Sequence, residues 1–172
     1  MVLTKTELRG KLRQEVRILE HLISKVDPAK LDYRPTPTQR SLLELLRYLT
    51  IFPRIHLRTI QAGVLEMEAW RCAWGTEEKA AKKRSLDRIR DEIGKQPALI
   101  AEVLDSLSDE DLRAEMDMFG SKASRGSWLV WLVLCHYTAY RMQLFLYLKS
   151  CGHEELGTLD VWVGIDAMPA GG

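Results

Sequence analysis

The sequence lacks the long apolar runs that mark membrane-spanning and secreted proteins. Its most apolar stretch, SWLVWLVLCHYTAY, breaks into polar groups halfway and falls short of the ~18 to 20 apolar residues of a spanning helix. The N-terminal segment carries a charge every few residues and has no apolar core of the kind found in secretory signals. These absences predict a cytoplasmic protein that does not enter a membrane.

The sequence also has few cysteines and almost no net charge. Cys72, Cys135 and Cys151 are odd in number and widely spaced, form no CxxC pair, and are interpreted as reduced thiols. Lysine and arginine number 25 against 24 acidic residues, so a net charge of +1 provides no general attraction for nucleic acid or an anionic membrane. The basic run from Lys79 to Arg90 is interleaved with acidic residues, which is typical of a solvated face.

What is present is a globular composition with helical periodicity in the first half of the chain. The 172 residues, 46% of them hydrophobic, suit one domain over residues 1–172 with a continuous core. Capping boxes at Thr4 and Ser41 predict two amphipathic helices, the first ending near Asp27 and the second near Gly63. Pro53 lies inside the second helix and predicts a kink.

The second half has a weaker pattern at its start and a stronger one at its end. Residues 64–75 have no clear period and are predicted to form an irregular crossover that places tryptophans on the bundle. A third helix is expected over residues 76–107, with Pro97 kinking or splitting it. After a loop, Ser127 is expected to cap a final apolar helix over residues 128–149. No run predicts a sheet, so the fold expected is an all-α four-helix bundle with a long crossover between its second and third helices.

Two polar stripes are candidates for a functional site. In the final helix, His136, Tyr140 and Gln143 recur at helical spacing, and Glu44 and Tyr48 do the same in the second helix. A weak internal repeat of two helical hairpins would bring Tyr48 towards His136. Facing polar stripes are how bundles build cofactor sites, but they are also satisfied by hydrogen bonds within an ordinary core.

Two motifs resemble those of the DinB-like (YfiT-like) family of bacterial four-helix bundles. The segment LDYRPTPTQRSLLELLRYL is similar to the family pattern Arg-Pro, a turn, then Ser-x-x-Glu-Leu-Leu-x-His-Leu. The segment HYTAYRMQLFLYLKSCG is similar to the family pattern His-x-x-x-His-Arg-x-Gln. The resemblance covers the chain up to its C-terminal tail and implies the same bundle.

The resemblance also implies a metal site that this chain does not reproduce. In the family, one histidine of the second helix and two of the fourth bind nickel or zinc, and some members use the metal to activate a thiol. Here the three positions are Tyr48, His136 and Tyr140. Because a tyrosine with a pKa near ~10 must lose a proton to ligate well, we predict no metal and no cofactor. The remaining histidines, including His56, are expected to be surface or capping residues.

The C-terminal segment GTLDVWVGIDAMP resembles the tail of one branch of the family. On that basis residues 153–172 are expected to fold back across the bundle, with Trp162 as their anchor.

Three functions follow as expectations. The first is a metal-free DinB-like protein with an interaction role or a vestigial small-molecule pocket around Glu44, Tyr48, His136, Tyr140 and Gln143. In that pocket at least one phenol hydroxyl should hydrogen-bond to His136 or Glu44, directly or through a water. The second is a metal-dependent thiol S-transferase or hydrolase. The third is a purely structural bundle, and a homodimer is expected because helical apolar surface exceeds what four faces need.

Overall fold

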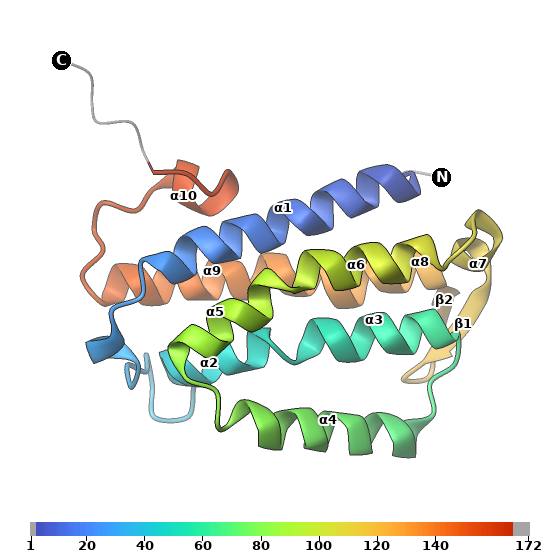
Figure 1. Ribbon diagram of the computed structural model, residues 1–172, viewed down its shortest axis with the longest axis horizontal. Helices are drawn as coiled ribbons and strands as arrows, with labels where there is room; N and C mark the ends of the chain where they lie inside the picture. Colours follow the sequence, from blue (N-terminus) through green and yellow to red (C-terminus); the bar gives the residue numbers. More distant parts are fainter. Residues whose placement is uncertain (1–2, 167–172) are drawn as a thin grey trace.

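The computed structural model describes residues 3–166 as a bundle of helices with one small hairpin (Figure 1). The bundle has four rods: α1 (Lys5–Ser24); α2 (Leu42–Leu49) followed by α3 (Phe52–Ala62); α5 (Leu86–Gly94) followed by α6 (Gln96–Asp105); and α8 (Arg125–Leu129), the π-helical segment η2 (Val130–Leu134) and α9 (Cys135–Ser150). The smaller elements are η1 (Pro28–Lys30), α4 (Met67–Ala81), α7 (Asp109–Arg113), β1 (Glu115–Met118), β2 (Ser121–Ser124) and α10 (Thr158–Trp162). The all-α bundle prediction is confirmed.

Side-chain caps determine where the helices begin. Thr4 and Ser41 each form the expected capping box, accepting a hydrogen bond from the backbone N–H three residues on. The last rod starts earlier than predicted. Its cap is Ser124 and not Ser127, because the Ser124 hydroxyl accepts the Ser127 N–H at 3.2 Å.

Prolines divide two of the rods. The kink expected at Pro53 is a full break, with α2 ending at Leu49 and α3 starting at Phe52. Pro97 likewise lies in the first turn of α6. Proline is tolerated in a first turn, where its missing N–H has no intrahelical partner, and disfavoured beyond it. Each proline therefore starts a new helix.

Two parts of the prediction for the connecting segments are wrong. Much of residues 64–75, expected to be irregular, belongs to the helix α4. Its only buried residue is Ala81, so there was no apolar period to detect. The long crossover between the second and third rods exists, but most of it is helical.

A sheet is also present where none was expected. β1 and β2 pair as an antiparallel hairpin from Glu115↔Ser124 to Met118↔Ser121. Phe119 and Gly120 both have positive φ, 55° and 78°, as a two-residue hairpin turn requires. With four residues in each strand, the alternation is too short to be distinguished from a loop.

The core lies between α1, α6, α9 and the α2–α3 rod, and a short polar chain crosses it. The fully buried Tyr137 donates from its hydroxyl to Gln96 Oε1 at 2.8 Å. Gln96 in turn donates from Nε2 to the Leu49 carbonyl at 2.8 Å. That carbonyl is at the end of α2, so the chain satisfies a group left free by the break before Pro53.

The C-terminal segment packs on α1 and α9 as far as it is described, and residues 167–172 of the expected tail lie outside the described residues. Asp160 and Val161 are buried, and Asp160 pairs with His21 Nε2 at 2.8 Å. Trp162 is 55% exposed, with its ring over the buried Arg141 guanidinium. Trp162 is therefore not the anchor, because the turn of α10 directs Asp160 and Val161 inward instead.

Among residues 3–166, no helix combines the length and the apolar character needed to cross a membrane.

Candidate functional site

Rings from four helices gather on one side of the bundle, in what we call the aromatic cluster. Its members are Tyr48, Phe52, His56, Trp70, Trp74, His136 and Tyr140. Tyr48 and Tyr140 have ring centroids 4.8 Å apart, and His136 lies 5.8 Å from Tyr140. The structure thus brings together the three side chains that the motif resemblance placed at one site.

His56 belongs to this cluster, contrary to its expected place at the surface. It is 5% exposed, its ring centroid is 5.4 Å from that of His136, and its Nδ1 has no hydrogen-bond partner among the described residues. Burial, together with the neighbouring His136, lowers the pKa of His56 to about 4. The sequence does contain a signal for this position of His56. Tyr48, Phe52 and His56 are spaced four residues apart, which places all three on one helical face.

The phenol hydroxyls do not make the expected bonds directly. Within residues 3–166, neither Tyr48 nor Tyr140 bonds directly to His136 or Glu44. The Glu44 carboxylate accepts instead from both terminal nitrogens of Arg34, at 2.8 and 2.9 Å, and this pairing lowers its pKa. A charged guanidinium outcompetes a neutral hydroxyl for a carboxylate, which is why no direct bond to Glu44 forms.

Gln143 makes hydrogen bonds away from the two phenols. Its Nε2 donates to the Tyr147 hydroxyl at 2.8 Å, and that hydroxyl donates to the Arg40 carbonyl at 3.0 Å. These bonds hold the loop that leads into α2. The Gln143 amide is therefore engaged with Tyr147 and, through it, with the backbone of that loop.

Next to the cluster, a cavity of about 440 Å³ opens between α2 and α4. It is lined by Arg40, Glu44, Arg47, Tyr48, Ile51, Trp74, Glu78, Ala81 and Lys82. We call it the α2–α4 pocket. The Arg40 guanidinium lies 4.2 Å from the centroid of the Tyr48 ring, a cation–π distance.

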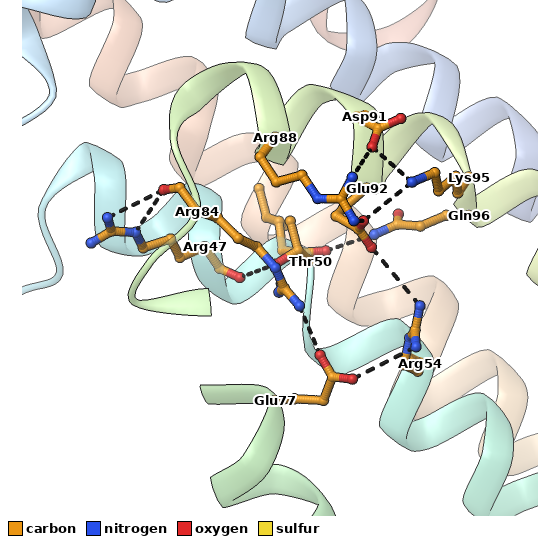
Figure 2. Close-up of polar contacts among 11 residues, drawn as sticks. Arg47, Thr50, Arg54, Glu77, Arg84, Arg88, Asp91, Glu92, Lys95 and Gln96 are labelled. Atoms are coloured by element: carbon orange, nitrogen blue, oxygen red, sulfur yellow. Dashed lines mark hydrogen bonds and ion pairs between the residues drawn. The ribbon is translucent and has the colours of Figure 1, made fainter. Parts of the chain in front are cut away.

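The charges around this pocket are unequally engaged. Glu44 is neutralised by Arg34, and Arg47 donates to the Arg84 carbonyl at 3.2 and 3.3 Å (Figure 2). Among the described residues, Arg40 and Lys82 have no carboxylate partner, and Glu78 has no cationic partner. Two cations and one carboxylate are thus free to meet a ligand beside the aromatic wall.

Comparison with known proteins identifies the family. The model of the DinB superfamily matches residues 11–137, well over half of the chain. The chain belongs to the DinB superfamily. A crystal structure of YjoA, a DinB-like protein from Bacillus subtilis, superposes with a TM-score of 0.67 at 19% sequence identity, covering 88% of this chain and 95% of that one. No match to a curated protein was found.

The DinB-like metal positions of this chain do not fit a divalent ion. Burial, reinforced by the Tyr140 hydroxyl beside it, raises the pKa of Tyr48 above its usual value. The Tyr48 phenolate, the form that could ligate, is thus disfavoured, and His136 is the single imidazole at the three positions. The described residues hold another group with ligand spacing, His21, Asp160 and Asp166, but Lys25 pairs with Asp166 there. That group fastens the C-terminal segment to α1.

Proposed function

We propose that this DinB-superfamily protein binds a small planar molecule with an anionic group in the α2–α4 pocket, without a metal. The observation that carries the proposal is the Arg40 guanidinium over the Tyr48 ring, with Trp74 beside them. Tyr48 and Trp74 provide apolar faces for a ring, and Arg40 and Lys82 provide charge for its acid.

The dimensions support this assignment. A volume of about 440 Å³ falls within the range of small-molecule pockets, ~300 to 1,000 Å³. A wall of aromatic side chains with a few convergent polar groups is the usual composition of such sites. Glu78, on the α4 side, would favour a ligand that also carries a hydrogen-bond donor, such as an indole or an amino group.

The test compares aromatic acids with their neutral amides. Indole-3-carboxylate and 2-naphthoate should bind, as measured by calorimetry, and the matching amides should bind at least ~10-fold more weakly, since they forgo a charged hydrogen bond. Arg40→Gln should erase the preference for the acid, while Arg71→Gln, a matched change on the exposed side of α4, should not. Equal affinity for acid and amide would refute the proposal.

The metal-dependent alternative has its own test. Nickel or zinc titration of the wild type should show no submicromolar site that depends on His136, for the reason given for Tyr48. The double variant Tyr48→His/Tyr140→His should create a three-imidazole site and bind either ion, because the Tyr140 ring lies against both the Tyr48 ring and the His136 ring. A folded double variant that binds neither ion would show that the motif transfer is wrong.

A structural role as a homodimer is favoured by a separate observation. The exposed residues Trp131, Cys135, Ala139, Met142 and Leu146 follow one stripe of the last rod, and Trp131 and Leu146 are 56% and 54% exposed. An uncharged stripe of this length suits contact with the same stripe of a second copy. Sedimentation should give twice the chain mass, and Leu146→Glu should return the protein to monomer. A wild type that sediments as a monomer at micromolar concentration would rule this role out.

A further inference from the structure

The opposite flank of α4 carries a second pair of cavities that meet at one side chain. A groove of about 530 Å³ runs between α3 and α4, and a cavity of about 390 Å³ lies at the C-terminal end of α4. Arg54 lines both. Neither shares a residue with the α2–α4 pocket.

The groove is apolar along its length. Its walls include Ile55, Ala62, Val64, Ala69, Trp70 and Ala73. From Arg54 to Ala62 the α3 wall extends about 12 Å at 1.5 Å per residue. Its charged residues are Arg54, Arg58, Glu66 and Glu77. A groove of this length and lining suits an extended apolar chain.

The adjoining cavity is cationic. Four of its six lining residues are basic, Arg54, Lys83, Arg84 and Arg88, against one acid, Glu92. The sequence had suggested a solvated face for this basic run. The fold adds Arg54 from α3 to a cavity that three members of the run, Lys83, Arg84 and Arg88, also line. Figure 2 shows Arg54 together with Arg84 and Arg88.

The four cations differ in what they can still bind. Arg84 is held in place by the Thr50 hydroxyl at 2.5 Å and by Glu77 at 2.8 Å, and Arg88 pairs with Glu92 at 2.7 Å. Arg54 reaches Glu77 and Glu92 only at 3.7 and 3.9 Å, beyond hydrogen-bond length.

Lys83 has no carboxylate partner in the described part of the chain. Arg54 and Lys83 therefore keep capacity for an anion, beside a fixed arginine that could orient it.

From this juxtaposition we propose that α3, α4 and α5 form a site for an amphipathic anion, with its apolar chain in the groove and a phosphate-type head on Arg54 and Lys83. The orientation follows from charge. Glu66 lies at the far end of the groove, and the two acids near the head, Glu77 and Glu92, are already paired with Arg84 and with Arg88. The site is independent of the pocket proposed above, because it uses the other flank of α4.

The experiment separates head from tail with four probes below their micelle concentrations: n-decyl phosphate, decanoate, decan-1-ol and inorganic phosphate. Calorimetry, with intrinsic tryptophan fluorescence as a second readout, should show decyl phosphate binding at least ~10-fold more tightly than decanol or inorganic phosphate. Decanoate tests whether a monoanionic head suffices. Added salt should weaken decyl phosphate more than decanol.

Matched variants test the head-binding residues and the groove separately. Lys83→Gln, at an exposed position, should weaken decyl phosphate at least ~5-fold and leave decanol unchanged, whereas Lys79→Gln on α4, which lines neither cavity, should change neither. Ala73→Glu in the groove should abolish binding of all three chain-bearing probes, and Cys72→Glu on the exposed neighbour should not.

Either of two results would overturn the proposal. One is decyl phosphate binding no tighter than inorganic phosphate. The other is binding that survives both Lys83→Gln and Ala73→Glu, which would indicate detergent-like association elsewhere on the surface. Neither result would affect the acid-versus-amide test at Arg40.

Discussion

Helices α1 and α4 are attached to the same molecule by different forces. α1 buries seven residues in the dry core, from Leu8 to Ile23, whereas α4 buries only Ala81. Two half-buried tryptophans, Trp70 and Trp74, account for most of the apolar contact of α4 with the bundle. The cavities that border α1 lie at its two ends, next to Leu8 and next to Ile23. The α4 side, held at a few points, has cavities on both flanks.

Ionic contacts complete the attachment of α4. Glu77 pairs with Arg84 at 2.8 Å and lies 3.7 Å from Arg54, which links α4 to the start of α5 and to α3 (Figure 2). Such contacts are directional but individually weak when partly solvated. The difference between α1 and α4 therefore predicts a gradient of stability across the molecule.

The largest effect is expected in α1. Leu19→Ala should lower the free energy of unfolding by about 2 to 5 kcal/mol, because the fully buried side chain leaves a cavity that the packed core cannot close. Urea denaturation measures this. Arg13→Ala, an exposed control in the same helix, should change it by less than about 0.5 kcal/mol. If both variants lowered the free energy of unfolding equally, α1 would not be held by close packing in the core.

A pH effect of up to about 3 kcal/mol is expected from His56. The unfolded imidazole takes up a proton below its ordinary value of 6.5, while the buried one stays neutral down to about 4. This stability is fully present above pH 6.5 and is lost as the pH falls towards 4.

Urea denaturation across that range should therefore show a steeper fall for the wild type than for His56→Phe. His153→Gln, at a half-buried position near the C-terminus, serves as the control. Parallel profiles for the wild type and His56→Phe would show that the His56 imidazole can charge in place.

Removal of a tryptophan should distinguish α4 from the core. Trp70→Ala should cost about 1 to 2 kcal/mol, less than a fully buried aromatic, because its ring is half-buried and meets Phe119 edge-on. Amide exchange should accelerate in α4 and stay unchanged in α1. Arg71→Ala, one residue further along, should alter neither, and acceleration throughout the bundle would contradict the gradient.

The smallest effect is expected at the ionic contact. Glu77→Gln should cost about 1 kcal/mol or less, since the pair with Arg84 is partly exposed. A double-mutant cycle with Arg84→Gln should give a coupling energy that shrinks with added salt. A coupling above about 2 kcal/mol that is insensitive to salt would place α4 among the rigidly held elements.

The sequence was sufficient to predict those features that depend on interactions between neighbouring residues, such as helix starts. Hydrogen-bonding side chains at Thr4 and Ser41 begin helices wherever the chain lies, and the apolar period of α1 defines its buried face. The motif containing Tyr48 and the one containing His136 and Tyr140 predicted that these side chains would converge, although their spacing alone left an ordinary core open.

The features that the sequence did not predict depend on contacts between elements far apart in the chain. Whether His56 faces solvent or a ring cannot be read from α3 alone, because its environment is made by Trp70, Trp74 and His136 from other elements. The sequence allows Glu44 to bond to either Tyr48 or Arg34. The folded loop places the Arg34 guanidinium at the Glu44 carboxylate, and this bond forms. The position of α4, with little apolar surface of its own, is likewise decided by its tertiary contacts, and with it the cavities on either side. The local code specifies where helices start and which face is apolar, whereas pockets and buried polar groups arise from contacts between segments far apart in the chain.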